Sequence, residues 1–172
     1  MKRVRRSIIL GISGISDKQE NPGRTVVVGL GNTILSDDGV GIYISREIKK
    51  KLSRPDIFVD EASTGGLELL EYITGFQKAV IIDAVSTGKN PPGTVIFLTA
   101  EDLPGGSSLT RHQVSLSEAI ELGRNIGMDL PSEILIFGVE VNDVTTFSEK
   151  CTPEVDRAIP VAAEKIISSL ED

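Results

Sequence analysis

Apolar residues in this chain alternate between short runs and helical stripes from residue 25 onwards. The runs predict β-strands at residues 25–30, 56–60, 78–85, 94–98 and 134–139. The stripes predict α-helices at residues 38–52, 67–74, 114–126 and 153–170. In the first helix apolar residues recur every fourth position, as Val40, Ile44, Ile48 and Leu52. The last helix contains Pro160, which predicts a kink.

The order of these elements predicts an α/β fold, a three-layer α/β/α sandwich around a five-stranded mixed sheet. Only residues 86–93 separate the third strand from the fourth. A parallel crossover needs about a dozen residues or more, so we expect the fourth strand to run antiparallel. Residues 25–172 are predicted to form one domain, and residues 1–24 a poorly ordered N-terminal extension.

The composition narrows the class of protein. The formal net charge is −7, which disfavours nucleic acid binding because phosphate neutralisation needs a positive face. No apolar run approaches the roughly 18–20 residues that span a membrane. Cys151 is the only cysteine, so no internal disulfide can form, and we expect a cytoplasmic location. The aromatic content of 4% favours a monomer, because it offers no obvious adhesive patch.

The first strand ends in a glycine-rich turn that carries two acids, Asp37 and Asp38, to the start of the first helix. Ligands of open α/β sheets bind beyond the carboxyl ends of the strands, which is where this turn lies. Gly29 and Gly31 resemble half of a dinucleotide fingerprint. However, Ile34 occupies the third glycine position, and the turn is too long and acidic for a pyrophosphate.

Three polar residues have no evident place in the scaffold: Asp38, Asp83 within the most apolar strand, and His112, the only histidine. If the first and third strands are neighbours, Asp38 and Asp83 face one crevice, and the loop after the fourth strand can bring His112 to it. Two carboxylates and an imidazole suit Ni, Zn, Fe(II) or Mn and leave coordination positions open. Structural alternatives stay open: Asp38 as a helix N-cap, Asp83 as a strand-end acid, and His112 as a surface residue.

The remaining acids and the thiol receive simpler interpretations. Asp37 is predicted to orient its neighbour rather than to bind metal. Asp60 and Glu61 are predicted to be solvated at the end of a strand. Cys151 has only Lys150 as a basic neighbour and is predicted to be an inert thiol.

Four motifs, in this order, resemble the hydrogenase maturation endopeptidases. They are Gly29-Leu30-Gly31-Asn32 with Ser36-Asp37-Asp38-Gly39-x-Gly41, then Ser63-Thr64-Gly65-Gly66-Leu67-Glu68-Leu69-Leu70, then Ile82-Asp83-Ala84, then His112-Gln113-Val114-Ser115-Leu116. The likeness covers about residues 25–170. It implies a sheet of strand order 2-1-3-5-4 with strand 4 antiparallel, which agrees with the argument from the short connection.

The resemblance also implies a function, removal of the C-terminal extension from the precursor of a [NiFe]-hydrogenase large subunit after nickel insertion. The metal-contacting positions of the family fall on Asp38, Asp83 and His112. Nickel is expected to arrive with the substrate, so the free enzyme is expected to hold no tightly bound metal. The family is often grouped with aspartyl proteases, but a paired-carboxylate dyad is not required here.

Two choices stay open at this point. The shared ion could act as a Lewis acid, or one aspartate could act as a general base. The chain could instead be a metal-dependent peptidase of a related sandwich fold with its own metal, or a hydrogenase assembly chaperone that does not cleave its client.

Overall fold

The computed structural model describes residues 24–63, 66–99 and 116–171. The elements follow one another as β1 (Thr25–Leu30), η1 (Ser36–Gly39), α1 (Val40–Lys51), β2 (Ile57–Ala62), α2 (Leu69–Ile73), β3 (Lys78–Val85), β4 (Val95–Thr99), α3 (Leu116–Asn125), β5 (Glu133–Glu140) and α4 (Pro153–Ser169). Of the predicted extension, residues 1–23 lie outside the described residues.

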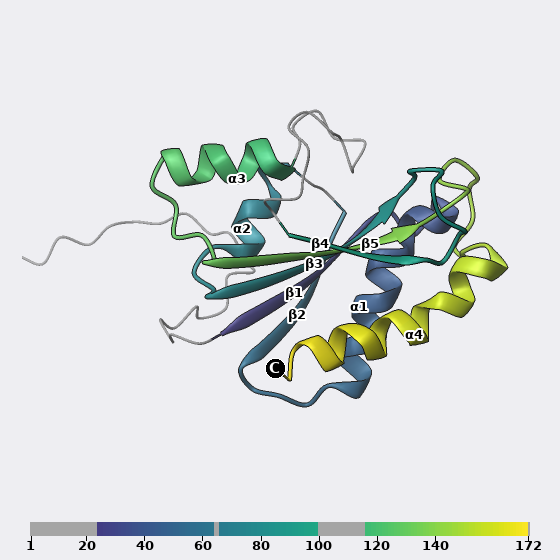
Figure 1. The fold of residues 1–172 in the computed structure, drawn as a ribbon, viewed down its shortest axis with the longest axis horizontal. Helices are drawn as coiled ribbons and strands as arrows, with labels where there is room; N and C mark the ends of the chain where they lie inside the picture. Colours follow the sequence, from purple (N-terminus) through teal and green to yellow (C-terminus); the bar gives the residue numbers. More distant parts are fainter. Residues whose placement is uncertain (1–23, 64–65, 100–115, 172) are drawn as a thin grey trace, which may run out of the picture.

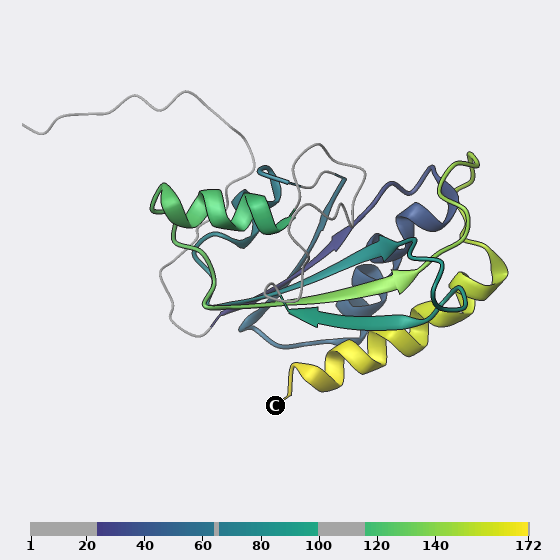
Figure 2. The ribbon, with the colours of Figure 1, turned by 45° about the horizontal axis from the view of Figure 1, so that its top comes forward.

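The sheet has the predicted order, β2-β1-β3-β5-β4. β1 pairs in parallel with β2 and β3, and β3 pairs in parallel with β5. β4 runs antiparallel to β5, as Figure 2 shows, which confirms the prediction made from the short connection after β3.

Helices cover both faces of this sheet. Figure 1 shows α1 and α4 on one side and α2 and α3 on the other. Because side chains of a strand alternate between faces, Val27 and Val80 pack under α1 and α4, whereas Val28 and Ile81 pack under α2 and α3. The α/β/α sandwich expected from the sequence is therefore confirmed.

The predicted boundaries differ from the structure mainly at two helix starts. The first helix does not begin at Asp38, because residues 36–39 form a separate 3₁₀ turn, η1, before α1. The N-cap residues of η1 and α1 are Leu35 and Gly39, so Asp38 is not a helix N-cap. α2 is shorter than predicted and spans only Leu69–Ile73.

Among the residues that the structure describes, no helix is both long enough and apolar enough to cross a membrane. Pro160 lies inside α4, as the sequence predicted.

Candidate active site

Close packing of glycines holds the start of α1 against the sheet. A Cβ atom added to Gly41 would lie 2.3 Å from the carbonyl oxygen of Ile82 and 2.4 Å from that of Leu30. At Gly29 a Cβ would lie 2.3 Å from the carbonyl oxygen of Gly41. The helix backbone therefore touches β1 and β3 directly, which brings η1 to the carboxyl ends of these two strands. The glycines of the first motif serve this packing.

Gly31 makes the sharp turn out of β1 possible. Its φ is +140°, and a Cβ there would lie 1.9 Å from the carbonyl oxygen of Asp38. A residue with a side chain would strain the backbone and also push η1 away. Asn32 adds a second tie, because its N–H donates to the same Asp38 carbonyl at 3.3 Å. The turn thus returns on itself and places Asp38 over the end of the sheet.

Asp37 anchors η1 to the loop that precedes α4. Its carboxylate is fully buried and accepts the backbone N–H of Thr152 at 2.6 Å and the Thr152 hydroxyl at 3.0 Å. The backbone N–H groups of Asp143 and Asn142 donate to the same carboxylate at 3.1 and 3.3 Å. Thr152 is the N-cap residue of α4, where a negative charge is favourable. Asp37 therefore orients the turn that carries Asp38, in line with its predicted role.

Asp83 lies near the carboxyl end of β3 and is 8% exposed. Its Oδ1 accepts the N–H of Ala84 at 2.9 Å. Burial raises the pKa of Asp83 well above its usual range; the Ala84 N–H opposes this, and the negative charge of Asp38 raises the pKa further. η1, which carries Asp38, contacts β3, which carries Asp83, so both residues lie at the carboxyl ends of β1 and β3. Two of the three predicted site residues therefore come from neighbouring elements at this edge of the sheet, and their role as a site stays a prediction.

His112, the third predicted site residue, lies outside the described residues. Its segment of the chain joins β4 to α3, and α3 covers the sheet face onto which Asp83 projects with Ile81. Within the described ranges no three His, Cys, Asp or Glu side chains are grouped as a metal site would require. The pair of carboxylates fits a divalent cation in donor chemistry, because a cation would relieve the repulsion between two acids of which one is buried.

Sequence reasoning missed Glu140, a third buried acid after Asp37 and Asp83, at the end of β5. Glu140 closes β5, is 2% exposed, and accepts the N–H groups of Thr87 and Gly88 at 2.7 and 2.8 Å. Burial by itself would raise the pKa of Glu140, but these donors and the Thr87 hydroxyl outweigh it and lower the pKa. Glu140 thus holds the loop between β3 and β4. The sequence did contain a signal for Glu140, because this acid directly follows the apolar run 134–139, much as Asp83 lies near the end of its own apolar run.

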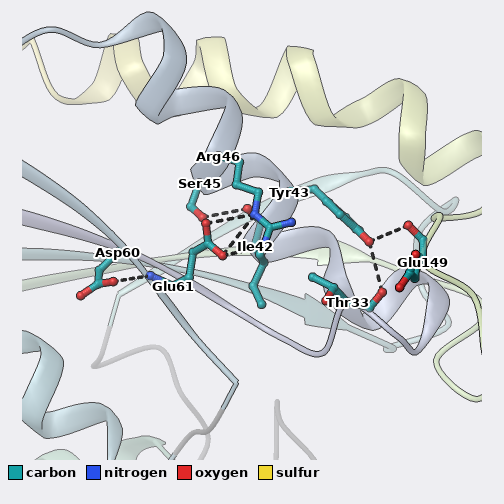
Figure 3. A network of polar contacts seen from close by, with 8 residues as sticks. All are labelled: Thr33, Ile42, Tyr43, Ser45, Arg46, Asp60, Glu61 and Glu149. Carbon is teal, nitrogen blue, oxygen red and sulfur yellow. Dashed lines mark hydrogen bonds and ion pairs between the residues drawn. The ribbon is translucent and has the colours of Figure 1, made fainter. Parts of the chain in front are cut away.

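The side chain of Glu61, near the end of β2, is 36% exposed, which agrees with the predicted solvation. Figure 3 shows that Glu61 also has a partner in α1. Its carboxylate forms a two-pronged ion pair with Arg46 of α1, with nitrogen–oxygen distances of 3.0 and 2.8 Å. The neighbouring Asp60 accepts the Glu61 N–H at 2.9 Å. The pair joins α1 to the carboxyl end of β2. Its two residues are 15 positions apart, and the sequence pattern gives no sign that they are in contact.

Cys151 behaves as the inert thiol that the sequence predicted. Burial, together with the negative charges of Asp37 and Asp156, raises its pKa to about 12. Its Sγ lies 3.7 Å from the carbonyl oxygen of Ser36, so the thiol packs against η1. Because the thiolate is the nucleophilic form, this environment opposes a catalytic role.

Comparisons with known proteins agree with the geometry. A family model described as HycI, hydrogenase maturation protease, matches residues 42–169. The hydrogenase 2 maturation protease of Escherichia coli (strain K12) is 28% identical over 152 residues, which cover 87% of this chain and 92% of that protein. Protein FrxA of Pyrococcus furiosus is 31% identical over 142 residues, 80% of this chain and 98% of that protein.

Solved structures give the same result. The hydrogenase maturating endopeptidase HybD from E. coli superposes with a TM-score of 0.75 at 26% identity, over 86% of this chain and 92% of that one. The HycI protease from Thermococcus kodakarensis, at 20% identity and a TM-score of 0.66, shares the fold. The chain belongs to the hydrogenase maturation protease family and is a peptidase.

Proposed function

We propose that this chain is the endopeptidase that removes the C-terminal extension of a [NiFe]-hydrogenase large-subunit precursor after nickel has been inserted. One observation supports the proposal within the family: Asp38 and Asp83 come from separate elements, η1 and β3, which contact each other where β1 and β3 end. This is the edge at which α/β sheets bind their ligands.

Nickel enters this proposal as part of the substrate. Asp38, Asp83 and His112 are proposed to contact an ion that the precursor carries, so the free enzyme would hold no tightly bound metal. When bound, the ion would supply Lewis-acid polarisation of a carbonyl or of a water molecule. Asp83 favours its protonated form more than an ordinary aspartate does, and so it could accept a proton as a general base. Asp37 and the packed glycines would hold Asp38 in place.

The test uses the nickel-loaded precursor, with its extension, as substrate. Asp38→Asn, Asp83→Asn and His112→Gln are each expected to abolish processing while the chain stays folded. Glu121→Gln, on the exposed surface of α3, is the matched control and should process normally. Mass spectrometry of the precursor's C-terminus reads out cleavage. Normal processing by the three site variants would refute the assignment of these residues.

Two further measurements separate this proposal from the other functions. Elemental analysis of the purified chain should find no stoichiometric metal, whereas a peptidase with its own metal would retain one. A precursor that stays uncut while bound to the wild-type chain would indicate an assembly chaperone instead. From the sequence we further propose that the enzyme works in the cytoplasm as a monomer.

A further inference from the structure

The loops after β1 and β5 pair beside the candidate active site. The N–H of Ser36 donates to the carbonyl oxygen of Ser148 at 2.9 Å, and the N–H of Ser148 donates to that of Ile34 at 3.1 Å. These bonds form an isolated parallel bridge between Leu35 and Ser148. We call residues 33–36 and 147–150 together the rim ribbon.

The rim ribbon presents two apolar side chains to solvent. In the register of the bridge, Ile34 lies opposite Phe147. Phe147 is 82% exposed, the highest value among large apolar side chains in the described part of the chain, and Ile34 is 49% exposed. Neither belongs to the two hydrophobic clusters that the described residues form. The fold therefore gains no core packing from this phenylalanine.

Several polar contacts fix the ribbon that carries these side chains. Tyr43 of α1 has its hydroxyl 2.7 Å from the carbonyl oxygen of Glu149 and 3.2 Å from that of Thr33, so it spans both strands of the ribbon (Figure 3). The Ser36 hydroxyl donates to the carbonyl oxygen of Lys150 at 3.4 Å. An exposed aromatic side chain on a fixed backbone loses little entropy on binding a partner, which favours affinity.

The ribbon is continuous with the turn that carries Asp38. Ile34 is four residues from Asp38, and steps of about 3.8 Å between Cα atoms place it within about 15 Å. A protein–protein interface of ordinary size buries about 800 Å² on each partner, a disc of roughly 16 Å radius. A folded client whose interface is centred on Asp38 therefore covers the rim ribbon as well.

We infer that the exposed pair Ile34 and Phe147 is a docking contact for the hydrogenase large-subunit precursor, which places an apolar patch of its surface on the rim ribbon. This inference rests on the proposed function for the identity of the client. Rigid attachment to η1 then links docking to the position of the scissile bond over Asp38. Phe147 is a binding residue in this scheme and takes no part in the chemistry.

The experiment measures both affinity and cleavage with the purified nickel-loaded precursor. Phe147→Ser is expected to weaken the Kd for the precursor about tenfold or more, as truncation of a central aromatic contact does. Ile34→Ser should weaken it in the same direction, and Phe147→Leu should weaken it less. In cleavage assays the loss should fall on KM and leave kcat unchanged, because the contact is the same in the ground and transition states.

Ile126→Ser is the matched control, because Ile126 is 67% exposed and follows α3. Melting temperatures of all variants verify the fold, and if Phe147→Ser proves unstable, Ile34→Ser decides. A Kd for Phe147→Ser equal to that of Ile126→Ser, with cleavage intact in the wild-type chain, would refute the docking contact alone. Binding that depends on Phe147 without any cleavage would support the contact and refute the proposed function. A wild-type dimer that Phe147→Ser dissociates would identify a second copy as the occupant and overturn the inference.

Discussion

Replacing Asp37 with Asn should destabilise the fold strongly although the two side chains have the same shape. The Asp37 carboxylate is 0% exposed and accepts hydrogen bonds from three backbone N–H groups and one hydroxyl. An Asn that keeps its oxygen on the Thr152 N–H turns its NH₂ group toward the N–H groups of Asn142 and Asp143. These two N–H groups, whose hydrogen bonds to Asp37 are partly buried, would then face another donor.

The magnitude of the destabilisation follows from the two N–H groups that lose their acceptor. A fully buried donor left without a partner costs about 1–3 kcal/mol, and these two donors are only partly buried, so Asp37→Asn should lower the free energy of unfolding by about 2–4 kcal/mol. For a chain of this size, about 1 kcal/mol corresponds to roughly 2–4 °C, which predicts a fall in Tm of about 5–15 °C.

Urea denaturation at pH 7, followed by circular dichroism, measures this effect directly. The midpoint should move to lower urea while the slope stays the same, since the surface exposed on unfolding does not change. Asp60→Asn is the control, because its exposed carboxylate needs only one oxygen to accept the Glu61 N–H. It should change stability by less than about 0.5 kcal/mol. A loss below about 1 kcal/mol in Asp37→Asn would refute the anchoring role.

Three further predictions concern other parts of the site. Because the pKa of Asp83 is raised in the folded chain, folding favours its protonated form. The stability of the fold therefore falls as the pH rises from the ordinary pKa of an aspartate through the raised pKa of Asp83. Asp83→Asn should raise Tm at pH 7.5, and this gain should shrink toward pH 4. A gain that is constant with pH would contradict this. Gly41→Ala should cost about 3 kcal/mol in urea denaturation because its Cβ meets two carbonyl oxygens, whereas Gly127→Ala, with φ of +77° and open space, should cost only about 1 kcal/mol. With a pKa of about 12, Cys151 holds roughly a thousandfold less thiolate at pH 8 than an unfolded thiol does, and the greater nucleophilicity of a more basic thiolate offsets part of this. Cys151 should therefore react with iodoacetamide at pH 8 about a hundredfold more slowly in the folded chain than in urea, and equal rates would show an accessible thiolate.

The fold could be predicted because its signals are local. Apolar runs such as 78–85 and the short connection before β4 determine strands and direction without knowledge of distant contacts. The start of the first helix could not be predicted as well, since η1 is held by hydrogen bonds from Asp37 to residues more than a hundred positions away. Sequence periodicity carries no trace of such contacts between loops.

The same distinction separates the parts of the candidate site. Asp83 could be identified because burying an acid in an apolar strand is costly unless the acid is paired or hydrogen-bonded. Asp38 could be identified because it follows a turn at the ligand-binding edge of the sheet. Glu140 and the Arg46–Glu61 pair were missed, because their partners are set by tertiary packing. The rim ribbon was missed for the same reason. The role of His112 stays a prediction.

The anchoring of η1 by Thr152 has a consequence for the protein during its synthesis. The turn that carries Asp38 is synthesised more than a hundred residues before the Thr152 amide that fixes it. A nascent chain, or one cut short before α4, lacks these partners, so its Asp38 has no fixed position. Proteolytic competence should therefore arise only after the chain has been synthesised through the start of α4.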